Sequence, residues 1–220
     1  IGEMENKGFE IELSGDIIKT PDLQLTVGGN ISFVNNKVTK LVPSAQNPEG
    51  DDIIRGNNII TVGEEINTFY VPQWAGINPA NGEPLFYNSD GDITNVYDSN
   101  ANVVLSGKSP LADYDGGFNL YLNYKGFDLT TDFYYKVGNY ILNYMESNML
   151  SDGTGVNYNQ RVDAFNYWRQ PGDTNVLPSP LYGNEAQQNS DRWLQKGDYI
   201  RLRNLTLGYN LPSKFAEAAY

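Results

Sequence analysis

The segment GGFNLYLNYKGFDLTTDFYYK, residues 116–136, alternates apolar and polar side chains on both sides of a turn at residues 124–127. Successive side chains of a strand point to opposite faces of a sheet, so this pattern predicts an antiparallel hairpin with one apolar face and one polar face. The segment constrains the rest of the fold, because its apolar face must meet either a protein core or lipid.

The same alternation recurs elsewhere in the chain and predicts an all-β, antiparallel fold. Residues 23–33 keep strict phase over their whole length, whereas an ordinary strand has about five or six residues. The predicted strands are residues 7–18, 23–41, 116–125, 127–140 and 198–211.

Each predicted strand separates its residues into two sets. We expect the apolar set to face lipid: Phe9, Ile11, Leu13, Leu23, Leu25, Val27, Ile31, Phe33, Phe118, Leu120, Leu122, Leu129, Phe133, Leu205, Leu207 and Tyr209. We expect the polar set to face a water-filled lumen: Glu10, Glu12, Gln24, Thr26, Asn30, Asn119, Asn123, Asp128 and Asp132.

Strand 198–211 leaves one question open, because Arg201 and Arg203 share the phase of Leu205. Either the arginines lie beyond the apolar zone, or a bulge near Asn204 shifts the register.

The connections between the predicted strands alternate between short and long. Short turns follow the first and third strands, and long segments occupy residues 42–115 and 140–196. Antiparallel strands cross a sheet from end to end, so all short turns lie at one end and all long loops at the other. This sorting is typical of outer-membrane barrels, which have short periplasmic turns and long extracellular loops. Five strands are too few to close a barrel, so this interpretation requires the chain to be part of a longer protein.

Composition excludes several classes of function. The chain has 15 Lys and Arg against 27 Asp and Glu, a formal net charge of −12, which argues against a nucleic-acid partner. It has no Cys and no His, so thiolate metal sites and Ser-His-Asp catalysis are not possible within it. No apolar run approaches the roughly 18 residues of a membrane-spanning helix, and no signal peptide opens the chain. We expect no enzyme activity, cofactor or metal.

Two loop motifs have a functional and a structural interpretation. Asn88–Asp92, NSDGD, resembles part of a calcium loop, but the twelfth position holds Ser99 instead of Glu, and a β-turn is favoured. WRQPGD, residues 168–173, predicts a fixed turn in which Arg169 pairs with Asp173. The loop aromatics are candidate contacts for a substrate or a lid protein, or else a small core that holds the loops in shape. The candidates are Tyr70, Trp74, Tyr87 and Trp168.

Five segments carry a family likeness. They are IGEMENKGFEIEL (1–13), GINPANGEPLFYNSDGD (76–92), GGFNLYLNYKGFDLTTDFYYKVGNYILN (116–143), YWRQPGDTN (167–175) and DRWLQKGDYIRLRNLTLGYNLP (191–212). In this order they resemble the C-terminal barrel of the SusC/RagA family of TonB-linked outer-membrane transporters. The resemblance implies a 22-stranded barrel in the bacterial outer membrane, of which this chain is a late portion without the plug domain and the remaining strands.

The resemblance also implies a function and partners. We expect TonB-dependent import of a nutrient, with an oligosaccharide favoured and an oligopeptide as the alternative. The implied partners are a SusD-like surface lipoprotein, TonB acting through a region outside this chain, and outer-membrane lipids. A different class also fits the alternation and the aromatic loops, namely a secreted soluble β-sandwich that binds carbohydrate or acts as an adhesin. That class does not explain the sorted loop lengths.

Overall fold

The computed structural model describes residues 2–150, 152–153, 157, 159–181 and 185–211, and most of its regular structure is β. Contacts divide the chain into two units, each described by itself. The strand unit comprises residues 5–36, 111–139 and those from 197 onward. The loop unit comprises the first four residues, 37–110 and 140–196.

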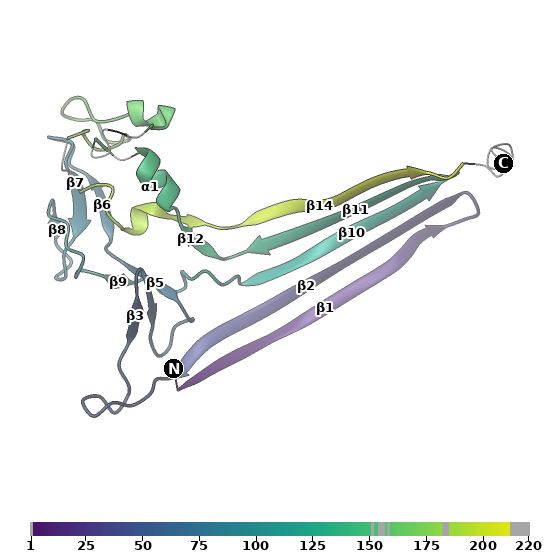
Figure 1. Cartoon of the computed structure of the whole chain (residues 1–220), viewed down its shortest axis with the longest axis horizontal. Coiled ribbons are helices and arrows are strands. Elements are labelled where there is room, and N and C mark those ends of the chain that lie inside the picture. Colours follow the sequence, from purple (N-terminus) through teal and green to yellow (C-terminus); the bar gives the residue numbers. More distant parts are fainter. Residues whose placement is uncertain (1, 151, 154–156, 158, 182–184, 212–220) are drawn as a thin grey trace. The chain divides into compact units, whose positions relative to one another are not determined.

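The strand unit is built on one five-stranded sheet with the spatial order β1-β2-β10-β11-β14. The five strands run side by side, with β1 at one edge and β14 at the other (Figure 1). They are β1 (Glu3–Lys19), β2 (Leu23–Lys40), β10 (Tyr114–Tyr124), β11 (Phe127–Val137) and β14 (Tyr199–Tyr209). The all-β, antiparallel fold expected from the alternation is therefore confirmed, with a first strand that begins at Glu3 instead of residue 7.

The short connections meet at one end of this sheet. Lys125 N donates a hydrogen bond to Asp22 O at 3.0 Å, and Asn210 N donates to Gly126 O at 2.7 Å. Lys125 and Gly126 have φ values of 48° and 89°, as the two central residues of a type I′ turn require. At the other end, Gly138 has φ 94° and stops β11 at Val137, three residues before the predicted end at 140.

The question about the arginines of β14 is answered by a β-bulge. Asp132 pairs with Asn204, but Phe133 pairs with Leu202, so Arg203 is an extra residue on β14. The slip returns Leu202 to the face of Leu205 and places Arg201 opposite Tyr134. A one-residue slip exchanges the two faces of a strand, so both arginines avoid the apolar face.

The loop unit contains regular structure that the sequence pattern did not reveal. The expectation of two irregular loops at 42–115 and 140–196 is corrected, because small sheets and short helices occupy them. One sheet holds β3 (Ile53–Arg55), β4 (Asn58–Ile60), β5 (Thr68–Val71) and β9 (Val103–Val104); another holds β6 (Trp74–Ile77), β7 (Pro84–Tyr87) and β8 (Ile93–Thr94); a third pairs β12 (Tyr140–Leu142) with β13 (Leu194–Lys196). The helices are α1 (Tyr144–Leu150), η1 (Val162–Phe165) and η2 (Asp191–Trp193). Strands of two to four residues are too short to show periodicity. No helix among the described residues is long and apolar enough to cross a membrane.

Two apolar clusters and one buried ion pair hold the loop unit together. Val38, Leu41 and Ile60 form one cluster, and Phe69, Val71 and Leu105 form the other. The buried pair joins Arg192 to Asp152, with Nη1 and Oδ2 2.7 Å apart and side chains that are 10% and 1% exposed. The guanidinium carbon lies 4.7 Å from the ring centre of Trp74 and 4.2 Å from that of Trp193.

Glycine has a specific role where a tyrosine crosses a strand of the sheet. Tyr135 Oη donates a hydrogen bond to Asn30 O at 3.1 Å, passing over Gly116 on the intervening strand β10. A Cβ on Gly116 would lie 2.1 Å from Asn30 O and 2.7 Å from Tyr135 Oη. Position 116 therefore accepts no side chain without a shift of the backbone of β2.

We predict that Gly116→Ala destabilises the sheet by about 1–3 kcal/mol, because the added methyl group collides with the backbone of β2. Gly15→Ala is the matched control, since a Cβ there meets nothing within 4 Å. Urea unfolding of the two variants in detergent, followed by circular dichroism, measures the difference. Equal midpoints for both variants would contradict the prediction.

We predict that Asp152→Ala lowers the stability of the loop unit by about 3–5 kcal/mol, because it leaves the Arg192 charge buried and unpaired. Arg161→Ala is the control: it breaks the ion pairs with Glu146 and Asp163, in which Arg161 is 43% exposed, and should cost at most about 1 kcal/mol. Hydrogen exchange of the amides of residues 190–194 reports the difference. Unchanged protection in the Asp152 variant would refute the structural role of the pair.

Candidate functional site

The strand unit presents two chemically different faces, and the register brings the predicted apolar residues onto one of them. Phe118 pairs with Phe133, and Leu122 pairs with both Leu129 and Leu25. The described part of the strand unit contains no second sheet or helix that packs on this face. Large side chains on it are accordingly exposed, reaching 74% for Leu13 and 75% for Leu207.

Aromatic rings gather at both ends of the apolar face. At the long-loop end the ring centres of Phe9 and Phe33 lie 4.8 Å apart, and Tyr114 follows at 5.6 Å from Phe33. At the short-turn end Phe127 lies 4.4 Å from Tyr209. Between these ends the side chains are mostly aliphatic, with one stacked phenylalanine pair and with Thr131 between Leu120 and Leu205.

The distance between these aromatic groups is close to a membrane thickness. Strand β10 runs from Tyr114 to Tyr124, and ten residue steps of about 3.4 Å span about 34 Å along the strand. The tilt of about 35–45° usual in membrane barrels reduces this length to about 24–28 Å, and the apolar band of such barrels is about 25 Å tall. Just beyond the band, Glu5 and Lys7 lie on the same face of β1 as Phe9. Their side chains form an ion pair at 2.7 Å.

The opposite face carries all nine residues predicted to line a lumen. Asn119 pairs with Asp132, and Asn123 lies between Asp128 and Gln24. Hydrogen bonds between side chains link neighbouring strands here: Thr26 Oγ1 donates to Asp16 at 2.7 Å, and Asn204 Nδ2 donates to Asp132 at 3.1 Å. The face therefore offers a hydrated, hydrogen-bonding surface.

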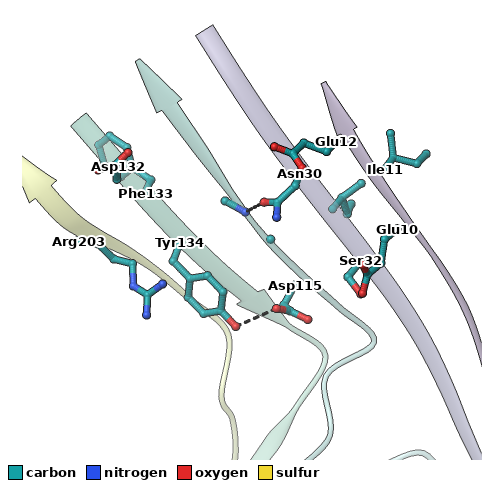
Figure 2. A pocket seen from close by; sticks show the side chains of 13 residues that line it. Glu10, Ile11, Glu12, Asn30, Ser32, Asp115, Asp132, Phe133, Tyr134 and Arg203 are labelled. Carbon is teal, nitrogen blue, oxygen red and sulfur yellow. Dashed lines mark hydrogen bonds between the residues drawn. The ribbon is translucent and has the colours of Figure 1, made fainter. Parts of the chain in front are cut away.

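A hollow of about 700 Å³ lies on this polar face, towards its long-loop end. Gly116 and Gly117 contribute backbone to its lining, and Asn30 Oδ1 accepts a hydrogen bond from Gly117 N at 2.6 Å. Figure 2 shows Glu10 and Glu12 of β1 on one side of the hollow and Arg203 of β14 on the other.

Tyr134 and the bulge residue Arg203 form a stacked pair at the β14 side of the hollow. The guanidinium carbon lies 4.9 Å from the ring centre, and Tyr134 Oη donates a hydrogen bond to Asp115 Oδ2 at 2.9 Å (Figure 2). Bulges commonly redirect a side chain next to a functional site. Sequence reasoning did not single out Tyr134 or Asp115, and it could not decide where the arginines of β14 lie, because a bulge has no reliable sequence signature.

The four loop aromatics predicted as contacts lie in three places. Trp74 and Tyr87 belong to the sheet of β6, β7 and β8, whereas Tyr70 belongs to the sheet of β5. Trp168 donates its indole N–H to Pro79 O at 3.1 Å. All four side chains are partly exposed.

The contacts of Trp74 favour a packing role. Its ring meets Phe86 edge-on at 5.2 Å and carries Arg192 on its face. Its backbone N–H donates to Asp191 Oδ1 at 2.7 Å. Burial raises the pKa of the Asp191 carboxyl, and this hydrogen bond opposes the shift.

The two loop motifs are both turns. Asn88 Oδ1 accepts hydrogen bonds from the backbone of Asp90 and Asp92, at 3.0 and 2.8 Å, and closes the hairpin of β7 and β8. Among the described residues no group of His, Cys, Asp and Glu is placed to hold a metal ion. In the second motif the expected Arg169–Asp173 contact forms through the backbone: Arg169 N donates to Asp173 Oδ2 at 3.0 Å, while its guanidinium donates to Phe165 O at 3.0 Å.

Comparisons with known proteins agree with this geometry. No protein-family model matches the chain. The TonB-dependent receptor P3 of Formosa agariphila is 32% identical over 237 residues, which cover 98% of this chain and 22% of the relative. The TonB-dependent receptor SusC of Bacteroides thetaiotaomicron is 27% identical over 231 residues, which cover 100% of this chain and 22% of the relative.

Solved structures give the same result. The RagAB peptide transporter matches with a TM-score of 0.82 at 26% identity, over 96% of this chain and 23% of that chain. The RagAB peptide importer in its open-open state matches with a TM-score of 0.83 at 25% identity. The chain thus spans about a fifth of the length of the curated relatives it matches. Together with the two-faced sheet, these similarities show that the chain resembles, over nearly its whole length, a portion of TonB-dependent receptors of the bacterial outer membrane such as SusC and the RagAB transporter.

Proposed function

We propose that this chain forms part of the wall of a TonB-dependent importer that carries an oligosaccharide, or alternatively an oligopeptide, across the outer membrane. The observation that carries the proposal is the exposed apolar face with an aromatic group at each end. In water such a face would leave Leu13, Leu205 and Leu207 solvated at 62–75% exposure, whereas hydrocarbon accommodates it. The opposite, hydrogen-bonding face then lines the lumen.

Further strands complete the wall in this proposal. The outer edges of β1 and β14 have no partner strand among the described residues. Unpaired backbone groups in hydrocarbon cost several kcal/mol each, so both edges require neighbours. The relatives are about five times as long as this chain, which leaves ample length for the rest of a barrel and for a plug.

The names of the relatives, TonB-dependent receptors and a RagAB transporter, support the partners that we propose. We expect a SusD-like lipoprotein to cover the extracellular mouth formed by the loop unit, and TonB to act through a region outside this chain. Tyr70, Tyr87 and Trp168 remain candidates for contacts with the substrate or the lid because they are partly exposed. Trp74 is the weakest candidate, since Phe86 and Arg192 cover its ring.

Import is tested in cells that depend on the complete protein. Deletion of its gene should abolish uptake of the nutrient and restoration should return it, with the protein recovered in the outer-membrane fraction. Recovery of the protein in the aqueous phase, monodisperse without detergent, would instead favour the soluble β-sandwich that binds carbohydrate.

In this proposal Leu205 of β14 faces lipid, and the next residue, Thr206, faces the water-filled lumen. We predict that Leu205→Arg lowers the free energy of unfolding by about 2–4 kcal/mol, because the charge enters the middle of the apolar band. Thr206→Arg, on the polar face next to it, should cost no more than about 0.5 kcal/mol. Urea titration of both variants in lipid vesicles measures the difference. A soluble protein would tolerate both changes, because Leu205 is 62% exposed.

A further inference from the structure

The positive charges of the polar face gather at one corner of the long sheet. Within the described part of the strand unit, the lysines and arginines on this face are Lys136 of β11 and Arg201 and Arg203 of β14. Lys136 pairs with Tyr199 and Arg201 pairs with Tyr134, so all three lie at the long-loop end of β11 and β14. The other lysines of the unit lie at its turns or on the apolar side. We call the three residues the cationic corner.

Two tyrosine rings hold the guanidinium groups of the cationic corner. The Cζ atom of Arg203 lies 4.9 Å from the ring centre of Tyr134, and that of Arg201 lies 5.1 Å from the ring centre of Tyr199. The two ring centres are themselves 6.0 Å apart, with 50° between the ring planes. Stacking covers one face of a guanidinium, but the N–H donors lie in its plane and stay available at the edge. The rings therefore orient both guanidinium groups without using their hydrogen-bonding capacity.

Two carboxylates of the hollow lie beside the cationic corner and are hydrogen-bonded to neutral side chains. Asp115 accepts a hydrogen bond from Tyr134 Oη at 2.9 Å, and Asp132 accepts one from Asn204 Nδ2 at 3.1 Å. Among the described residues no ion pair includes any of the three cations. The nearby carboxylates would repel a dense polyanion, so the corner suits a ligand whose negative charges are spaced apart.

We propose that the cationic corner binds the carboxylate or sulfate groups of an acidic oligosaccharide. Arg201 and Arg203 donate paired N–H groups to the anionic oxygens, and the ammonium group of Lys136 adds a third positive charge. Hydroxyl groups of neighbouring sugar rings donate to the carboxylates of the hollow and accept from the amide of Asn30. A sugar chain that combines spaced anionic groups with many hydroxyls matches both parts of this surface.

This inference rests on the proposed import function and narrows its substrate class. A neutral oligosaccharide would use the hydroxyl-binding groups but would leave the three cations without a counter-ion. An acidic peptide offers carboxylates, but its backbone supplies only one donor per residue to the carboxylates of the hollow. The corner depends on the bulge at Arg203, since an unbroken register would place both arginines of β14 on the apolar face.

The test is calorimetric titration of the complete protein in detergent with two acidic probes, a hexamer of galacturonic acid and a hexamer of sulfated κ-carrageenan. The methyl ester of the galacturonate hexamer keeps the sugar rings and removes the charges. Arg201→Gln/Arg203→Gln removes the guanidinium groups, whereas Arg201→Lys/Arg203→Lys keeps the charges and loses the planar donors. Lys125→Gln is the matched control, because Lys125 also stacks on a tyrosine, Tyr124, at the short-turn end of the sheet.

We expect the glutamine variant to weaken binding of the acidic hexamers about three- to tenfold, since exposed ion pairs are individually weak, and the lysine variant to weaken it less. The neutral ester should bind equally to the wild type and to both variants. Added sodium chloride should lower the affinity of the wild type more steeply than that of the glutamine variant, because salt screens the charge pairs that the variant lacks. Lys125→Gln should leave every dissociation constant unchanged. The acidic hexamer that loses more affinity identifies carboxylate or sulfate as the preferred group.

Failure of both acidic hexamers to bind, or equal losses for the galacturonate hexamer and its neutral ester, would overturn the proposal. So would tighter binding of a six-residue peptide of glutamates than of either sugar. If the glutamine variant lowers the melting temperature without ligand and leaves sugar binding intact, the arginines pair with a carboxylate of a neighbouring strand instead. Each of these results leaves the proposed import function standing, because that function fails only if deletion of the gene leaves nutrient uptake unchanged.

Discussion

An apolar sheet face without a protein layer over it is the constraint on which the rest of this structure depends. In an ordinary β-sandwich the inner face of one sheet packs on a second sheet about 10 Å away. Here the leucines of β1 and β14 are largely exposed, and the strand unit supplies no second layer among its described residues. In the proposed function hydrocarbon covers this face, and the two aromatic groups lie where the hydrocarbon would end.

The bulge at Arg203 shows how a local irregularity keeps the two faces separate. Without it, Arg201 and Arg203 would follow Leu205 onto the apolar face, where each charge would cost about 2–4 kcal/mol near the midplane. With it, Leu202 takes the place on the apolar face and both arginines leave it. One inserted residue thus keeps both charges off the apolar face and places them on the polar face.

The loop unit is stabilised by other interactions than the long sheet. Its strands have only two to four residues, which gives little backbone pairing. Stability comes instead from two small apolar clusters and from the buried Arg192–Asp152 pair between two tryptophan rings. Some aromatic residues that the sequence suggests as ligand contacts pack within the loop unit instead, and Trp74 is the clearest case.

The sequence by itself determined the five long strands, their two faces and the family resemblance. Alternation with period two places Leu25, Leu122 and Leu129 on one face and Asn123 and Asp128 on the other, because neighbouring side chains of a strand must point in opposite directions. The same alternation, with the order of short and long connections, predicted a membrane barrel.

Only the tertiary structure decided what depends on pairing between strands. The register slip at Arg203 is a property of β11 and β14 together, and the hollow requires Glu12, Gly117 and Arg203 from strands far apart in the sequence. The short sheets of the loop unit were missed for the same reason, since they form through contacts that leave no local periodic pattern. A sequence pattern reports the environment of each strand separately, whereas a binding surface is made by the neighbours that pairing brings together.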